Sequence, residues 1–186
     1  MHFEDTNLPW VLPSPNMPTP DTARVYPGGC LVEGTNLSEG RGTTRPFELV
    51  GAPWLDGPDL AASLRDENLP GVLFRATSFR PMFQKHAGKI CAGVQVHVID
   101  RERFRPFAAY LLLLRETRRQ AGGDFGWRRE PYEFESERLA IDLLLGRSDL
   151  RSMIEGNAPL ATMEASWSQG LSEFLRTRQR FLLYPE

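Results

Sequence analysis

Residues 33–48, Glu-Gly-Thr-Asn-Leu-Ser-Glu-Gly-Arg-Gly-Thr-Thr-Arg-Pro-Phe-Glu, concentrate the groups of this chain that could do chemistry. The segment holds three carboxylates, two guanidiniums, three glycines, an amide and four hydroxyls. Asn, Thr and Glu side chains can bond sugar hydroxyls, an Arg fork binds a carboxylate at two points, and glycine lets the backbone approach a ligand closely. The segment therefore predicts a concave polar site for a small hydroxyl-rich or anionic ligand. The alternative is a solvated, glycine-rich surface loop.

Glu33 and Glu39 bracket the first part of this segment. Glycoside hydrolysis needs an acid and a base or nucleophile on the two sides of the scissile bond, so these two are the candidate catalytic residues. Taken singly, each carboxylate is better suited to accept a sugar hydroxyl or to pair with an arginine than to act as a catalyst. Their spacing alone therefore assigns no catalytic residue.

Composition excludes several classes of function. The chain has 186 residues, 41% of them hydrophobic, with a formal net charge of −2. This suits a single soluble domain, or slightly more, and gives no general attraction to nucleic acid or to an anionic membrane. The longest strongly apolar run, residues 107–114, is too short to span a bilayer. Residues 1–5 are polar and acidic rather than a signal peptide, so the sequence as written predicts a cytoplasmic protein.

No motif indicates a metal or a cofactor. His86, Cys91 and His97 do not form a tight ligand pair, and a fourth ligand is missing. Neither a phosphate loop nor a dinucleotide fingerprint nor a Gly-x-Ser-x-Gly elbow is present. Cys30 and Cys91 are far apart and lie in no Cys-x-x-Cys pair, so two buried free thiols are expected rather than a disulfide, although the sequence does not decide the pairing.

The chain divides into three parts. Residues 1–29 carry six prolines and several large apolar side chains, which predicts an extended, irregular strap packed on the body. Its rigid bend at 14–18 would present Asn16 as a polar contact, or form an Asx turn instead. Residues 30–56 are the polar site loop, entered by a short strand at 30–33. Residues 57–186 are the body.

Within the body, apolar periodicity predicts a helix at 58–66 capped by Asp56, strands at 72–80 and 90–99, and a helix at 101–120. Short helices follow near 137–145 and 149–155, the second with Ser148 as its N-cap. A last helix at 159–180 carries an apolar stripe predicted to be core. The expected fold is α+β, with a small mixed β-sheet formed by 30–33, 72–80 and 90–99 and packed against the 101–120 and 159–180 helices.

The sequence resembles the NamZ family of exo-β-N-acetylmuramidases, formerly the domain of unknown function DUF1343. The resemblance extends over essentially the whole chain and is carried by residues 13–19, 26–28, 33–48, 85–88, 91–95 and 182–184. It implies hydrolysis of the terminal N-acetylmuramic acid at the non-reducing end of cell-wall fragments. Arg41 or Arg45 would then bind the lactyl carboxylate of that sugar, and Thr35, Asn36 and Glu39 its hydroxyls and acetamide. The full set of substrate-binding candidates is Asn16, Glu33, Thr35, Asn36, Glu39, Arg41, Thr43, Arg45 and His86.

One departure from the family matters. Its members are about twice as long, and their expected catalytic glutamate lies in a Rossmann-like half that this chain does not match. We therefore expect the chain alone to lack activity, and a separate Rossmann-like half to be its partner. The alternatives are a non-catalytic carbohydrate-binding module and an inactive gene fragment. Family enzymes act on cell-wall material, so the resemblance also allows a periplasmic or extracellular location.

Overall fold

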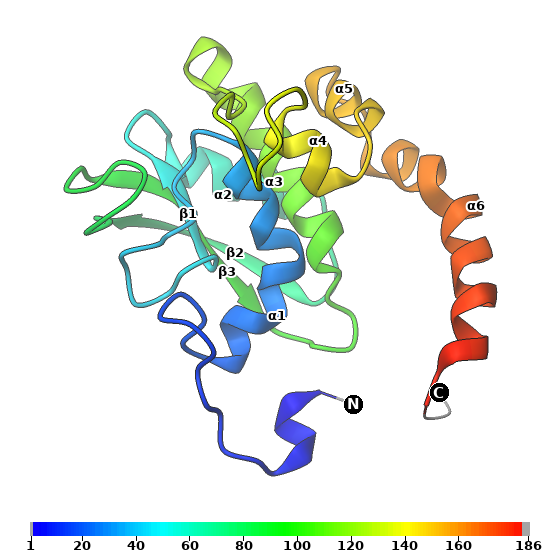
Figure 1. The fold of residues 1–186 in the computed structure, drawn as a ribbon. Helices are drawn as coiled ribbons and strands as arrows, with labels where there is room; N and C mark the ends of the chain where they lie inside the picture. The colour runs from blue at the N-terminus through cyan, green and yellow to red at the C-terminus, as the bar shows by residue number, and fades with distance from the viewer. Residues whose placement is uncertain (1, 184–186) are drawn as a thin grey trace.

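The computed structural model describes residues 2–183, and its centre is a three-stranded antiparallel sheet (Figure 1). The strands are β1 (Leu49–Ala52), β2 (Val72–Phe79) and β3 (Cys91–Val98), in the order β1-β3-β2. The predicted strands at 72–80 and 90–99 and the α+β class are confirmed. Both strand pairings are antiparallel, so the sheet is not mixed.

Side chains of the central strand β3 alternate between the two faces of the sheet. Val94 and Val96 are buried in the core, whereas Gln95 and His97 on the other face are half-buried. Close approach of β1 to β3 requires glycine, because a Cβ on Gly93 would lie 2.0 Å from the carbonyl oxygen of Val50. The short strand β1 follows the polar loop directly and thereby anchors its end in the sheet.

Helices α2 (Gly57–Asp66) and α3 (Pro106–Ala121) supply a large part of the remaining core. The side chain of Asp56 accepts a hydrogen bond from the backbone N–H of Asp59, as predicted for the N-cap of α2. Helix α2 packs on β2 and β3, and α3 packs on α2. All four leucines at 111–114 are buried, as their continuous apolar run predicted.

The predicted extended strap is wrong from Pro20 onward. Residues Pro20–Gly29 form helix α1, which packs on α3, and Phe3–Thr6 form a 3-10 turn, η1. Pro20 occupies the first turn, where a proline loses no helical hydrogen bond, and Thr19 caps the helix by accepting from the N–H of Thr22. Packing on α3 outweighs the one hydrogen bond that Pro27 cannot make.

The predicted strand at 30–33 is also wrong. Cys30–Gly34 form a 3-10 helix, η2, that continues directly from α1, so the polar loop is entered from a helix. Both cysteines are free, as expected, although only Cys91 is fully buried and Cys30 is partly exposed. None of the helices within residues 2–183 is long and apolar enough to cross a membrane.

The C-terminal region contains α4 (Ala140–Leu145), α5 (Asp149–Glu155), α6 (Leu160–Arg178) and the 3-10 turn η4 (Gln179–Phe181). Ser148 precedes α5, but its side chain makes no capping hydrogen bond. The family-like motif at 182–184 ends on Tyr184, which lies outside the described residues.

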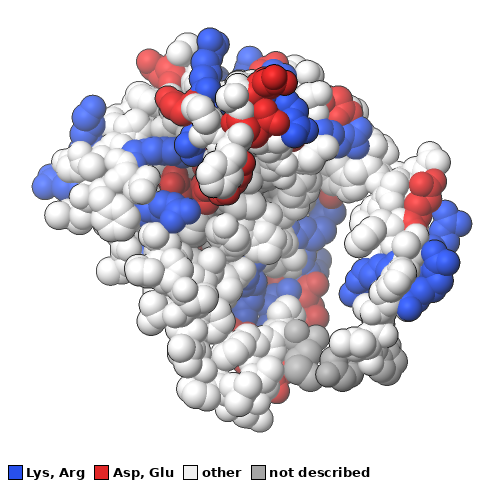
Figure 2. Space-filling model, in the orientation of Figure 1, with Lys and Arg blue, Asp and Glu red and all other residues white. Residues whose placement is uncertain are grey.

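Only the first half of α6 belongs to the core. Met163 is buried and Trp167 packs edge-on against Phe107, whereas Leu171 and Phe174 are exposed. Figure 2 shows the outer part of α6 standing apart from the body. The predicted core stripe is therefore wrong beyond Trp167, because helical periodicity specifies an apolar face but not the surface that covers it.

Candidate functional site

The polar loop turns its charged side chains inward. Glu39 is only 3% exposed, and the guanidinium of Arg41 donates from Nε to Glu39 Oε1 (3.1 Å) and from Nη2 to Glu33 Oε1 (2.9 Å). The same guanidinium lies 5.0 Å from the centre of the Phe47 ring, within range of a cation–π contact. This segment is therefore part of the packed structure rather than a solvated loop.

Two residues from distant segments complete this charge cluster, which consists of Glu33, Glu39, Arg41, Lys85 and Tyr132. Lys85 Nζ lies 3.0 Å from Glu39 Oε2 as an ion pair, without the alignment of a linear hydrogen bond, and donates to the Val32 carbonyl at 3.0 Å. The Tyr132 hydroxyl donates to Glu33 Oε2 at 3.2 Å. Burial lowers the pKa of Lys85, and burial together with the Glu33 carboxylate raises the pKa of Tyr132.

The charged groups of the cluster are paired with one another. Both candidate catalytic carboxylates, Glu33 and Glu39, are paired with cations, and the Nε and Nη2 groups of Arg41 already bond those carboxylates. A free Arg41 fork for a ligand carboxylate would require breaking these pairs, at the cost of leaving a buried charge unpaired. The cluster is thus suited to holding the loop in place.

Beside the charge cluster lies an open groove of about 590 Å³, within the size range of small-molecule sites. Its lining residues come from the polar loop, from residues 84–86 and from the segment after α3: Thr35, Asn36, Gln84, Lys85, His86, Trp127, Arg128, Arg129 and Glu130. Three of the predicted binding residues, Thr35, Asn36 and His86, therefore meet in one site. Lys85 belongs to both the groove and the charge cluster.

Asn36 joins the two walls of this groove. Its side-chain Nδ2 donates to the carbonyl of Asp124 (2.8 Å), its Oδ1 accepts from the N–H of Gly126 (3.0 Å), and its own N–H donates to the Gly126 carbonyl (2.9 Å). On the other side, the Asn36 carbonyl lies 2.8 Å from His86 Nε2. Asn36 is thus largely committed to positioning the walls, and His86 is held by the same backbone.

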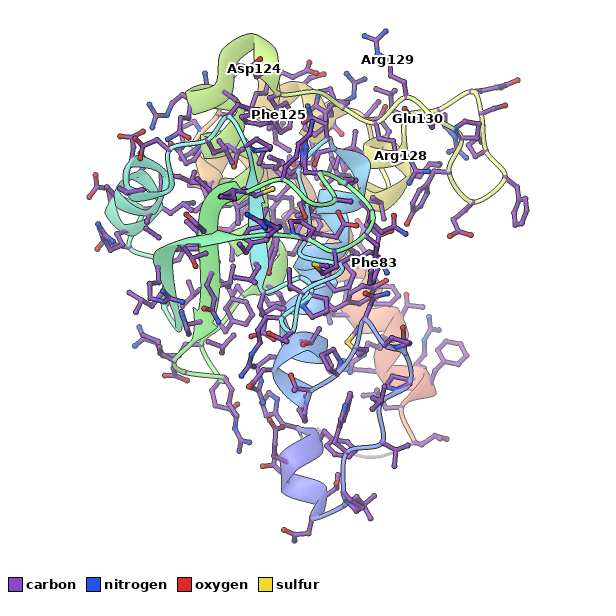
Figure 3. All side chains as sticks on the ribbon, turned by 90° about the vertical axis from the view of Figure 1, so that its left-hand side faces the viewer. Phe83, Asp124, Phe125, Arg128, Arg129 and Glu130 are labelled. Atoms are coloured by element: carbon purple, nitrogen blue, oxygen red, sulfur yellow. The ribbon has the colours of Figure 1, made fainter. Side chains whose placement is uncertain are left out.

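The far wall is formed by Trp127 and the arginines that follow it. The indole N–H of Trp127 donates to Glu155 Oε1 (2.7 Å), and its ring packs edge-on against Phe125 at 4.9 Å between centroids. Figure 3 shows Arg128, Arg129 and Glu130 along this segment, with Arg129 projecting outward. Figure 2 shows basic and acidic side chains intermingled over this end of the molecule.

Arg128 and Arg129 differ in their contacts. Arg128 Nη2 donates to the carbonyl of Pro131 (3.1 Å), and its guanidinium lies 5.3 Å from the centre of the Tyr132 ring. The Arg129 side chain has no hydrogen bond or ion pair within residues 2–183. Neither arginine was among the binding residues predicted from the sequence. The available signal was an aromatic residue followed directly by two arginines.

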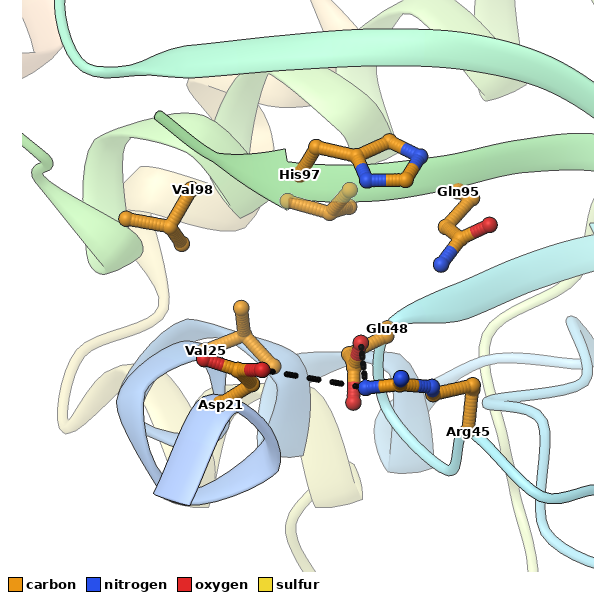
Figure 4. A pocket seen from close by; sticks show the side chains of 8 residues that line it. Asp21, Val25, Arg45, Glu48, Gln95, His97 and Val98 are labelled. Carbon is orange, nitrogen blue, oxygen red and sulfur yellow. Dashed lines mark hydrogen bonds and ion pairs between the residues drawn. The ribbon is translucent and has the colours of Figure 1, made fainter. Parts of the chain in front are cut away.

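The structure does not bring the remaining candidates to the groove. Thr43 closes a local turn, donating to the Gly40 carbonyl and accepting from the N–H of Arg45. Asn16 lies in a turn at which its N–H donates to Ser14 Oγ, so the serine rather than an Asx side chain closes the bend. Arg45 faces a separate, smaller cavity with Asp21 and Glu48 (Figure 4). Within the described part of the chain, no group of three or more metal-binding side chains is present.

Comparison with known proteins decides the family. The model of the family described as exo-beta-N-acetylmuramidase NamZ, C-terminal, matches residues 24–184. This chain belongs to that family. It is 44% identical over 184 residues to the peptidoglycan beta-N-acetylmuramidase NamZ of Bacillus subtilis (strain 168), a match that covers 99% of this chain and 42% of that protein.

Two solved DUF1343 family proteins from Bacteroides fragilis NCTC 9343 share the fold. One superposes over 100% of this chain and 48% of its own length with a TM-score of 0.84, and the other over 94% and 44% with a TM-score of 0.67, each at 26% identity. The chain therefore spans less than half the length of these relatives. The family suggested by the motifs is confirmed, and so is the link to peptidoglycan hydrolases.

Proposed function

We propose that this chain is the C-terminal, substrate-binding portion of a glycoside hydrolase that removes N-acetylmuramic acid from the non-reducing end of peptidoglycan fragments. The family and the Bacillus subtilis relative support the substrate class. The observation that carries the proposal is the groove, in which an indole, a paired ammonium and an arginine side chain without a partner in residues 2–183 surround about 590 Å³.

The lactyl carboxylate distinguishes N-acetylmuramic acid from N-acetylglucosamine, so its partner determines specificity. The structure favours Arg129 for this contact over Arg41, whose Nε and Nη2 already bond Glu39 and Glu33. Arg128 bonds the Pro131 carbonyl and lies 3.9 Å from the Glu130 carboxylate, but a guanidinium has more donors than these contacts use. It is therefore the second cation within reach of a ligand carboxylate at this wall. The flat face of Trp127 suits the apolar face of a sugar ring.

Catalysis would require a further contribution. Because Glu33 and Glu39 are both tied into ion pairs, neither is free to act as a general acid, and we propose that a Rossmann-like part of the full-length enzymes supplies the catalytic carboxylate. The relatives have more than half their length beyond the matched region. Exposed apolar side chains on the N-terminal segment and on α6, among them Val11 and Phe174, are available for contacts with such a part.

The same pairing of Glu33 and Glu39 favours a second candidate, a non-catalytic module that binds the sugar. The two candidates differ in one assay. Under the first, adding the N-terminal part of a relative to this chain restores release of N-acetylmuramic acid. Under the second, the mixture binds the sugar without turnover.

Calorimetric titration with N-acetylmuramic acid and with N-acetylglucosamine tests the proposed binding. We expect saturable binding of the acidic sugar, with an affinity about tenfold higher than that of the neutral one, corresponding to about 1.4 kcal/mol for one charged contact. Arg129→Ala should remove this preference while leaving binding of N-acetylglucosamine unchanged. Equal affinity for both sugars in the unmodified chain, or no binding of either, would contradict the proposal.

A further inference from the structure

A second cavity, of about 180 Å³, lies next to the first residue of β1, where β3 continues without β1 beside it (Figure 4). It is lined by Asp21, Val25, Arg45, Glu48, Gln95, Val96, His97 and Val98, none of which lines the groove. At the density of liquid water this space would hold about six water molecules. It is thus too small for an oligosaccharide and suits one functional group with part of its carrier.

One wall of the cavity presents two hydrogen-bond donors. Their orientation is fixed by hydrogen bonds on the side away from the cavity. Arg75 Nη2 donates to Gln95 Oε1 (2.5 Å), and Arg75 Nε donates to His97 Nε2 (3.3 Å). Because arginine can only donate, these bonds leave the Gln95 amide NH₂ and the His97 Nδ1–H as the free groups of the two side chains. Figure 4 shows both nitrogen atoms on the cavity side. Burial and the neighbouring arginines lower the pKa of His97, which keeps the ring neutral with this single proton.

The opposite wall presents acceptors. The buried Glu48 carboxylate accepts from Thr22 Oγ1 (2.9 Å) and from Arg45 Nη1 (3.3 Å), and Asp21 lies 3.7 Å from the same Arg45 nitrogen. Each carboxylate has acceptor capacity beyond these contacts. Asp21 and Glu48 thus place two carboxylates on the wall that a ligand N–H would face, and a ligand carboxylate in that position would be repelled.

The backbone of β3 adds a donor and an acceptor. The N–H of Val96 bonds to the Glu48 carbonyl at 2.8 Å, just beyond the end of β1. In an antiparallel strand, alternate residues direct both backbone groups to the same side. The N–H and C=O of Val98 therefore point to the side of β3 that β1 does not reach. The side chains of Val25 and Val98 provide apolar surface in the cavity.

We propose that this cavity binds a neutral secondary amide. The amide carbonyl accepts from Gln95 and His97, its N–H donates to the carboxylate wall, and its acyl methyl contacts the valines. The acetamido group of an amino sugar and an acylated peptide unit share this chemistry. The inference does not depend on the function proposed for the groove, because the two sites share no residue.

Titration of the ¹⁵N-labelled chain with three small probes tests the site. N-methylacetamide should shift the Gln95 side-chain amide and the Val98 backbone N–H in a saturable way. Methyl acetate lacks the N–H and acetate adds a charge, so both should bind at least about tenfold more weakly, the loss of roughly one charged hydrogen bond. Equal responses to all three probes, or no response at Gln95 and Val98, would overturn the proposal.

Substitutions at the cavity provide a second test of the amide site. Gln95→Glu keeps the acceptor for Arg75 but removes the donor, so it should weaken N-methylacetamide binding about tenfold. Gln179→Glu makes the same change at an exposed position in η4, away from both cavities, and should have no effect. If Gln95→Glu does not fold, Arg75→Lys, which removes the two-point hold on Gln95 and His97, should weaken binding in its place. Unchanged binding in the folded variant would count against the site.

Two larger probes distinguish the source of the amide. Tighter binding of N-acetylglucosamine than of N-acetylalanine methylamide assigns the site to an amino sugar, and the reverse assigns it to a peptide. Binding of neither probe, when N-methylacetamide binds, would overturn the assignment to a natural acetamido or peptide ligand.

Discussion

The ammonium of Lys85 lies 3.0 Å from Oε2 of Glu39 and joins the 80–90 loop to the polar loop. Through Arg41 the same carboxylate is linked to Glu33 and, through Glu33, to Tyr132. Three segments that are distant in the sequence are thus held together by one buried set of charges. The groove exists because these segments are fixed relative to one another.

Removing one charge from this set should be costly. Glu39→Gln leaves Lys85 and Arg41 without their shared carboxylate in a buried position, and we expect a loss of about 3–5 kcal/mol in the free energy of unfolding. Urea denaturation followed by circular dichroism measures this. Arg138→Ala, which breaks an exposed ion pair with Glu135, is the control and should leave stability unchanged within error. A similar small effect for both variants would mean that the charge cluster is not structural.

Gly28 should resist substitution, because a Cβ at this position of α1 would lie 2.2 Å from the carbonyl oxygen of Pro106 at the start of α3. Gly28→Ala is expected to separate the two helices and to cost more than about 2 kcal/mol, in the range of overpacked core sites. Gly170→Ala, in an exposed turn of α6 where no atom of residues 2–183 lies within 4 Å of the added Cβ, should instead stabilise by about 0.5–1 kcal/mol. Thermal unfolding of both variants would reveal whether the difference in sign holds.

The two halves of α6 should respond differently to truncation. Met163→Ala removes a fully buried side chain and should cost about 2–5 kcal/mol. Phe174→Ala removes a side chain that is 60% exposed and should change stability by less than about 0.5 kcal/mol. Chemical denaturation of the isolated chain checks this, and a large loss for Phe174→Ala would show that the outer half of α6 is covered in solution.

Glu48 should make stability depend on pH. Burial raises its pKa above the ordinary value of 4.5, so between the two values the folded chain binds more protons than the unfolded chain. The contribution of Glu48 is therefore fully present below pH 4.5 and is lost as the pH rises through the raised folded pKa. Glu48→Gln mimics the protonated form, so its stability relative to the unmodified chain should increase with pH across this window. A difference that stays constant with pH would contradict the assignment.

Trp127 should contribute to binding through its ring face. Trp127→Ala is expected to weaken N-acetylmuramic acid binding about tenfold, whereas Trp127→Phe, which keeps an aromatic face but loses the bond to Glu155, should retain most of the affinity. Calorimetry on both variants, each first checked for folding, measures the two effects. Equal losses would assign the role of Trp127 to its hydrogen bond with Glu155 instead.

Local patterns were sufficient to predict most elements of the body. The alternation in β3, the Asp56 cap of α2 and the apolar run of α3 each specify their structure through short-range rules. Helix α1 was missed because the prediction considered the number of prolines and not their positions. Pro20 lies in the first turn of the helix, where proline is tolerated. The exposed half of α6 shows the limit of helical periodicity, which predicts an apolar face but not the surface that covers it.

Only some of the predicted site residues lie together in the structure, for a related reason. The polar loop was identified by composition, and Thr35, Asn36 and His86 do line one groove. Which charges pair with which depends on the three-dimensional approach of Lys85 and Tyr132 to the loop, and this cannot be read from spacing. Arg41 and Arg45 lie four positions apart, yet Arg41 enters the charge cluster whereas Arg45 lines the second cavity.

The central claim is that the groove beside the charge cluster binds an acidic amino sugar. The most direct test is to titrate the ¹⁵N-labelled chain with N-acetylmuramic acid and follow the indole N–H of Trp127, the side-chain amide of Asn36 and the guanidinium of Arg129. We expect saturable shifts at these three groups, with smaller shifts at the Arg129 guanidinium when N-acetylglucosamine is used. Shifts confined to Arg41 and the interior of the charge cluster, or the absence of any saturable shift, would contradict it.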